Sequence, residues 1–161
     1  MSTTRLFFAR ALLVAGEMQR GPQYEQALVA VMTGEDSTAW WNPMDTTLGT
    51  DGATPYNSFG PGDNWHVWNY PSAEVGIKAT IDTLKQPNMA RFYDAMCKPD
   101  MTSLELTEQF SFTPWGGIGD KLPFLIVSEC ETRQRSYVAD RRNKVFGPGP
   151  WPYRANGEPF C

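Results

Sequence analysis

The sequence predicts a mainly α-helical domain with one long loop region and an extended C-terminal arm. A chain of 161 residues with 41% hydrophobic and 20% charged residues has the size and composition of a single folded domain. Apolar residues recur every three or four positions through most of the chain up to Phe110, which indicates amphipathic helices. Glycine, proline and aromatic residues are concentrated between residues 36 and 71, which indicates the loop region.

Two helices are expected at the start of the chain. An apolar stripe predicts a helix from Thr4 to about Met18. Gly21-Pro22 interrupts this pattern, and proline suits the first turn of a following helix. The second helix should end near Gly34, which leaves Glu35 at its C-terminal end or just beyond it.

The segment from 36 to 71 is expected to be a long loop, because it contains most of the turn-forming residues. A loop of this length in a compact domain is usually functional unless it contains a short hairpin, and both alternatives stay open. The segment also carries many aromatic side chains, which are Trp40, Trp41, Tyr56, Trp65, Trp68 and Tyr70.

Three further helices are expected after the loop. Ser72 is a good N-cap for the first of them, and a short helix is expected over Met89–Met96. Thr102 and Glu105 have the spacing of a capping box and predict another helix through Phe110. The residues expected to form the buried face of the helix after Ser72 are Val75, Ile77, Ile81 and Leu84.

Residues 119–161 are expected to form a separate C-terminal region. The apolar run Phe124–Val127 could be a strand, but the charged residues that follow favour a long helix through Val145. From Phe146 the chain is too rich in proline for a helix and should be extended. Residues 133–161 carry six basic and two acidic side chains, which form either a solvated helix face or a surface that docks on an anionic partner.

The composition excludes several kinds of chemistry. The single histidine, His66, rules out a multi-histidine metal site, and three widely spaced cysteines match no zinc pattern. The body of the domain lacks a basic patch with interleaved aromatic residues. The apolar stretch Leu6–Ala15 is too short to span a membrane and is interrupted by Arg10. We therefore expect no metal, no cofactor, no nucleic-acid partner and no membrane partner.

Carboxylate chemistry on a sugar remains. Cleavage of a glycosidic bond needs a protonated carboxyl group beside the leaving oxygen, and a partly dry environment raises the pKa of a carboxyl. Glu35 follows an apolar helix and precedes Trp40 and Trp41, so it is the best candidate for such an acid. The simpler alternative is a solvated glutamate at a helix end, with both tryptophans in the core.

Four sequence blocks occur in order along the chain. The first is Glu35 followed by Asn42-Pro43-Met44-Asp45-Thr46-Thr47, and the second is Thr54–Gly60. The third is Asn69-Tyr70-Pro71-Ser72, and the fourth is Pro114-Trp115-Gly116. At this spacing the blocks together resemble the lysozyme-like domains of bacteriophages and prophages.

The resemblance covers roughly residues 4–118 and has two departures. Met44 and Asp45 stand where leucine and often asparagine are usual in this pattern. The stretch Gly60–Trp68 is longer than the usual turn, so it could cover the cleft or add a subsite.

The resemblance implies a lysozyme-like helical domain over residues 1–118 that cleaves the glycan strand of peptidoglycan, with Glu35 as the general acid. It fixes no second catalytic carboxylate. Asp45 and Asp51 are candidates, although both are more simply interpreted as turn residues. Together with the aromatic loop, it gives the residues expected to bind substrate, which are Trp40, Trp41, Asn42, Thr46, Thr47, Tyr56, Asn57, Asn69 and Tyr70.

The expected function is that of a phage enzyme, a glycoside hydrolase or lytic transglycosylase that degrades the bacterial cell wall. Its expected location is the virion tail, or the host cytoplasm and then the cell wall if it serves in lysis. One alternative is an inactive tail or baseplate protein that keeps the fold and assembles with other phage proteins through residues 119–161. A glycan-binding module without turnover is a further alternative.

Overall fold

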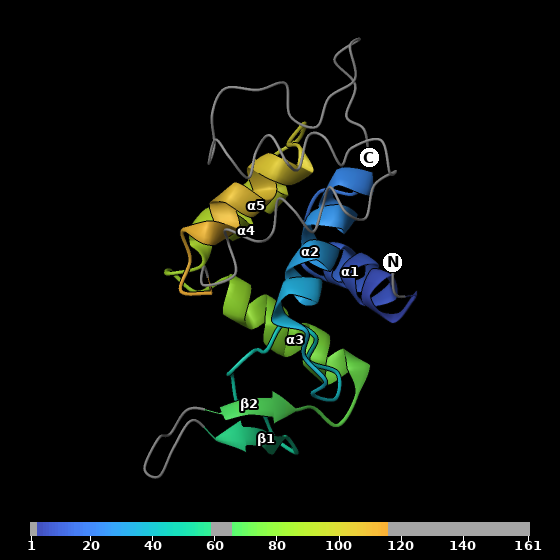
Figure 1. Ribbon diagram of the computed structural model, residues 1–161, viewed down its shortest axis with the longest axis vertical. Coiled ribbons are helices and arrows are strands. Elements are labelled where there is room, and N and C mark those ends of the chain that lie inside the picture. Colours follow the sequence, from blue (N-terminus) through green and yellow to red (C-terminus); the bar gives the residue numbers. More distant parts are fainter. Residues whose placement is uncertain (1–2, 59–65, 116–161) are drawn as a thin grey trace.

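A computed structural model describes residues 3–58 and 66–115, and within these ranges the protein is mainly helical (Figure 1). The helix or strand expected over 124–145, the extended arm and the basic segment 133–161 lie outside the described residues, as does Trp65. The elements are α1 (Thr3–Ala15), α2 (Pro22–Glu35), β1 (Thr54–Ser58), β2 (His66–Asn69), α3 (Ala73–Leu84), α4 (Ala90–Cys97) and α5 (Ser103–Ser111).

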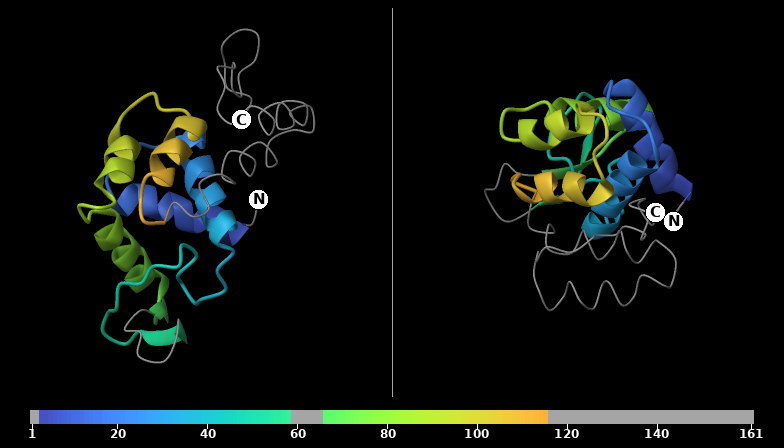
Figure 2. Two further views of the ribbon diagram at one scale, coloured as in Figure 1. Left: turned by 60° about the vertical axis from the view of Figure 1, so that its left-hand side comes forward. Right: turned by 90° about the horizontal axis from the view of Figure 1, so that it is seen from above.

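The helices pack together, and the two strands lie beyond the N-terminal end of α3 (Figures 1 and 2). Helix α1 packs against α2 and α3, α5 packs against α2 and α4, and α3 makes a smaller contact with α4. None of the helices in the described ranges is both long and apolar enough to cross a membrane.

Helix α2 is the central element of the core. Every residue from Ala27 to Met32 is fully buried, as expected of a helix that is apolar on all sides. Burial of each large apolar side chain stabilises the fold by about 1.5–3 kcal/mol. The largest apolar side chains with almost no exposed surface are Leu12, Leu13, Leu28, Met32, Met44, Leu84, Phe92, Met96, Leu106 and Phe110.

Local signals in the sequence set most of the helix starts, as expected. Helix α2 begins at Pro22, and the Ser72 hydroxyl accepts a hydrogen bond from the Val75 amide at the start of α3. At the start of α5, Thr102 and Glu105 form both hydrogen bonds of a capping box. Each such cap stabilises a helix by about 1 kcal/mol.

Helix α1 ends at Ala15, earlier than the expected Met18. The backbone of Glu17 has a φ of 56°, which belongs to the left-handed region and reverses the chain. The Met18 amide then donates to the Leu13 carbonyl, and the Met18 side chain is buried. The apolar stripe therefore continues into a turn that folds back on the core.

The buried face of α3 differs in part from the expected one. Ile81 and Leu84 are buried as predicted, whereas Val75 and Ile77 are only half-buried. Gly76 and Thr80 are buried instead, because the loop after α2 contacts them through Trp41 and Thr46. The buried residues of α3 are Gly76, Ala79, Thr80, Ile81, Thr83 and Leu84.

The long loop region contains the short sheet that was one of the alternatives. Strands β1 and β2 pair antiparallel, with Thr54 opposite Asn69 and Ser58 opposite His66. The register is irregular between Pro55 and Asn57, as in a β-bulge. The side chains of Trp68 and Asn69 in β2 form hydrogen bonds with the loop after α2 and join it to the sheet.

Candidate active site

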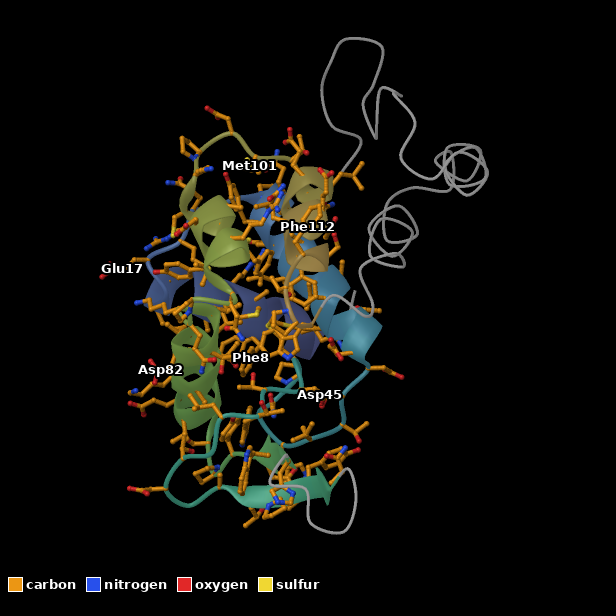
Figure 3. The ribbon with its side chains drawn as sticks, turned by 90° about the vertical axis from the view of Figure 1, so that its left-hand side faces the viewer. Phe8, Glu17, Asp45, Asp82, Met101 and Phe112 are labelled. Atoms are coloured by element: carbon orange, nitrogen blue, oxygen red, sulfur yellow. The ribbon has the colours of Figure 1, made fainter. Side chains whose placement is uncertain are left out.

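Glu35 is the last residue of α2, and its carboxyl group lines a pocket of about 670 Å³. The pocket walls come from the end of α2, the loop that follows it, β2, the junction of α3 and α4, and the segment after α5. Asp45, labelled in Figure 3, comes from the loop between α2 and the sheet. The lining residues are Glu35, Asp45, Thr47, Val67, Thr83, Gln86, Asn88, Met89, Pro114 and Trp115.

The end of α2 separates two consecutive carboxyl groups. Asp36 caps the helix in the left-handed conformation, with a φ of 49°, and its amide donates to the Met32 carbonyl at 3.2 Å. The Asp36 carboxylate, 84% exposed, accepts a hydrogen bond from Arg5 of α1 at 2.9 Å. Glu35 is half-buried in the pocket instead. The cap and the ion pair thus hold Asp36 toward α1, so that of these two consecutive carboxyl groups only that of Glu35 belongs to a residue that lines the pocket.

Three features of the site favour the neutral form of Glu35. Burial, and secondly the negative charge of Asp45, raise the pKa of Glu35 from 4.5 to about 7. The C-terminal end of a helix carries a partial negative charge, which also disfavours an ionised carboxyl there. A carboxyl with this pKa holds its proton on a large fraction of the molecules at neutral pH, so Glu35 can act as a proton donor.

Asp45 is the second carboxyl group among the described residues that line the pocket. Burial raises the pKa of Asp45, and a hydrogen bond from the Ser37 side chain lowers it. Its Oδ1 atom is buried and has no hydrogen-bond partner in the described part of the chain. Asp51, the other candidate, is exposed in the turn before β1 and does not line the pocket.

The other residues that line the pocket are either polar and uncharged or apolar. Gln86 and Asn88, near the end of α3, contribute amide groups that both donate and accept hydrogen bonds. Trp115 packs on Phe110 with ring centroids 6.1 Å apart, and Phe110 in turn meets the edge of Phe92 at 5.1 Å. Two buried phenylalanine rings therefore support the Trp115 ring at the wall of the pocket.

Of the residues predicted from the sequence, Glu35 and Thr47 meet in this pocket. Asn42, Thr46 and Tyr70 lie beneath the surface, and their polar groups are used inside the protein. The Asn42 amide donates to the carbonyls of Thr46 and Trp68, and the Tyr70 hydroxyl donates to the Leu48 carbonyl. Burial raises the pKa of Tyr70. These three residues build the loop and do not line the Glu35 pocket.

Two asparagines of the predicted set also bond to the backbone. The Asn57 side-chain carbonyl accepts from the Val67 amide at 3.2 Å, within the sheet. The Asn69 side-chain carbonyl accepts from the Trp40 amide at 2.8 Å and fixes the loop against β2. Neither residue lines the Glu35 pocket.

The other three aromatic residues that were predicted to bind substrate are exposed, but they do not line the Glu35 pocket. Trp40, Trp41 and Tyr56 are 71%, 45% and 43% exposed, and none of them lines the Glu35 pocket. Trp41 instead lines a separate hollow of about 380 Å³ next to α1. Nearness to Glu35 in sequence therefore does not bring these rings to its carboxyl group.

Sequence reasoning did not select Gln86, Asn88 or Trp115 as site residues. Trp115 belongs to the Pro-Trp-Gly block, so a signal for it was present. Gln86 and Asn88 flank Pro87 in a segment that marks only the end of a helix, and their role depends on how α3 packs. Within the described ranges, no group of three or more histidine, cysteine, aspartate or glutamate residues could hold a metal ion.

The roles of the pocket residues can be argued only from their own chemistry. No family model, curated protein sequence or solved structure matches this chain. The two carboxyl groups, the uncharged polar wall and the tryptophan are the observations on which a function has to be based.

Proposed function

We propose that this protein is a lysozyme-like enzyme that cleaves glycosidic bonds in the glycan strand of bacterial peptidoglycan, with Glu35 as the general acid. One observation carries the proposal. Glu35 is half-buried in an open pocket, and its surroundings raise its pKa to about 7. Glycosidic cleavage needs a carboxylic acid that is still protonated near neutral pH.

The rest of the pocket suits a sugar chain. Hydroxyl and acetamido groups are uncharged and polar, and the amides of Gln86 and Asn88 can exchange hydrogen bonds with them. The ring of Trp115 offers an apolar face for the C–H groups of a sugar ring. No basic side chain is among the described residues of the wall, so the pocket offers nothing to an anionic ligand such as a phosphate.

The chemistry follows from the protonated state of Glu35. Glu35 donates its proton to the glycosidic oxygen, and the electron pair of the C1–O bond goes to that oxygen as the bond breaks. A water molecule or the 6-hydroxyl of the same sugar then bonds to C1, and its proton returns to Glu35. Water gives a new reducing end, whereas the 6-hydroxyl gives an anhydro sugar.

The phage origin, a location in the virion tail or at the host cell wall, and assembly through residues 119–161 belong to the same proposal. They are based on the resemblance of the sequence blocks around Glu35, Asn42 and Asn69 to phage lysozyme-like domains.

The proposal is tested by incubating purified peptidoglycan with wild type, Glu35→Gln and, as a matched control, Asp36→Asn. General acid catalysis contributes about 10²–10⁴-fold, so Glu35→Gln should lose at least a hundredfold in product release. Asp36→Asn should keep near wild-type activity, because Asp36 faces solvent and α1. Thermal unfolding of each variant checks that it is folded.

Chromatography of the products distinguishes the two reactions, since new reducing ends mean hydrolysis and anhydro-muropeptides mean transglycosylation. Undiminished release by Glu35→Gln would contradict the role of Glu35. Absence of product from folded wild type on several wall types would favour an inactive structural or glycan-binding protein instead.

A further inference from the structure

Asp45 is held in a conformation that few side chains adopt. Its φ of 51° lies in the left-handed region, where aspartate and asparagine are better tolerated than most residues. The side chain lines the pocket, yet Oδ1 is buried with no hydrogen-bond partner in the described ranges. A buried carboxylate oxygen without a hydrogen-bond partner costs free energy, and a positive charge nearby would offset that cost.

The turn around Asp45 is held by hydrogen bonds to Asn42 and by the burial of the two neighbouring residues. The Asn42 carbonyl accepts from the Asp45 amide at 3.3 Å, and the Asn42 side-chain oxygen accepts from the Thr46 amide at 2.8 Å. Met44 and Thr46, the neighbours of Asp45, are fully buried. Because both neighbours are buried, Asp45 is held at the wall of the pocket.

Helix α3 supports this turn from behind. The carbonyl oxygen of Trp41 lies against Gly76, where a Cβ atom would be only 2.0 Å away. The Thr46 and Thr80 hydroxyls are 3.4 Å apart, and Thr80 also donates to the Gly76 carbonyl. The close contact leaves the turn little freedom to move Asp45 away from the pocket.

Among the described residues that line the pocket, none carries a charge opposite to that of Asp45. Glu35 and Asp45 are the titratable groups among the described lining residues, and no lysine, arginine or histidine is present there. His66 of β2 is bonded to the Asn57 carbonyl and does not line the pocket. A site with this charge is suited to a ligand that becomes positive during the reaction.

We propose that Asp45 is the second catalytic carboxylate of the site and stabilises the positive charge that develops on the sugar as the glycosidic bond breaks. This inference rests on the proposed function. Positive charge appears on C1 and the ring oxygen when the C1–O electron pair leaves with the oxygen protonated by Glu35. Asp45 stays ionised throughout, and Glu35 recovers its proton from the attacking water or 6-hydroxyl.

The same charge acts on Glu35 before the reaction starts. The negative charge of Asp45 contributes to the raised pKa of Glu35, so it helps to keep the proton that is later donated. One carboxylate therefore serves both the ground state and the transition state. This double role gives the inference a readout that a merely structural aspartate would not affect.

The test compares Asp45→Asn with Asp51→Asn, the same change at an exposed turn. Asparagine tolerates the left-handed conformation, so Asp45→Asn should stay folded. Loss of a preorganised electrostatic group costs about 10²–10³ in kcat, and we expect a loss of that size for Asp45→Asn on peptidoglycan. Asp51→Asn should keep the wild-type kcat, and Asp45→Glu should recover part of the activity by restoring the charge.

The pKa of Glu35 is measured in parallel by carboxyl NMR on wild type and Asp45→Asn, without any substrate. It should fall in the variant, and the alkaline limb of the activity profile should move to lower pH with it. An unchanged kcat or an unmoved pKa of Glu35 would overturn the inference while leaving the role of Glu35 intact. An inactive wild type would instead refute the proposed function, and the inference with it.

Discussion

The carbonyl oxygen of Trp41 occupies the space in which a side chain at Gly76 would begin. A Cβ atom at position 76 would lie 2.0 Å from that oxygen and 3.1 Å from the Trp41 Cβ. Trp41 itself has a φ of 55°, so a left-handed residue of the loop is pressed directly against the first turns of α3. This contact joins the loop that carries Asp45 to the helix that leads to Gln86 and Asn88.

Gly76→Ala should therefore destabilise the protein. Helix propensity alone would favour alanine by about 1 kcal/mol. Overpacking against a backbone atom costs typically about 1–3 kcal/mol, so we expect a net loss in the free energy of unfolding, measured by urea denaturation. Activity should fall as well, because the turn that presents Asp45 must shift. A variant as stable as wild type would mean that the loop and α3 are not in close contact.

Asn42→Ala should remove the side chain that closes the turn around Asp45. Asn42 is fully buried, and its loss leaves the Thr46 amide and the carbonyls of Thr46 and Trp68 without their partner. Each unpaired buried group costs about 1–3 kcal/mol, so we expect a total loss of at least about 3 kcal/mol in thermal or urea unfolding. If Asn42 instead served only to bind substrate, as the sequence led us to expect, stability would hardly change and KM would rise.

Trp115→Ala should weaken the binding of a short muropeptide, whereas Trp40→Ala should not. Trp115 lines the Glu35 pocket, while Trp40 is 71% exposed and lies outside it. Loss of one aromatic contact of about 1.4 kcal/mol corresponds to roughly tenfold weaker affinity. Calorimetric titration of both variants on the Glu35→Gln background, in which the ligand is not cleaved, checks the difference. Equal affinities would show that the ligand does not use this wall.

Glu35→Gln should gain stability relative to wild type as the pH rises. The folded protein raises the pKa of Glu35 from 4.5 to about 7, so its contribution to stability is complete below pH 4.5 and is lost as the pH rises to 7 and above. Because Glu35 is only half-buried, solvent screening reduces the effect to about 1–2 kcal/mol. Urea unfolding below pH 4.5 and above pH 7 measures it. A pH-independent difference between the two proteins would contradict the raised pKa.

The helices could be predicted from the sequence because their signals are local. Pro22, Ser72 and the Thr102–Glu105 capping box each act within a few residues, and the structure confirms all three helix starts. The end of α2 was predicted near Gly34 and lies at Glu35, so the place of Glu35 at the end of the helix was among the predicted alternatives.

The composition of the pocket could not be predicted in the same way. Which side chains face Glu35 depends on the left-handed residues Trp41 and Asp45, which turn the loop in a direction that no short motif specifies. The tryptophans after Glu35 were expected to line a cleft beside it and do not line its pocket, and the buried Asn42 amide bonds to the backbone. Gln86 and Trp115 reach the pocket only through the packing of α3 and α5 on the core.

The hydroxyl group of Tyr24 has a consequence for the order in which the chain can fold during synthesis. It donates to the Lys98 carbonyl and accepts from the Met101 amide, which joins the start of α2 to the chain after α4. Tyr93 makes a similar bond to the Gly16 carbonyl. A nascent chain that has emerged only as far as α3 lacks Tyr93, Lys98 and Met101. Tyr24 and the Gly16 carbonyl are then without these hydrogen-bond partners. Both hydrogen bonds of Tyr24 can form once residue 101 has left the ribosome, and the last described segment that lines the pocket, which carries Trp115, follows directly behind it.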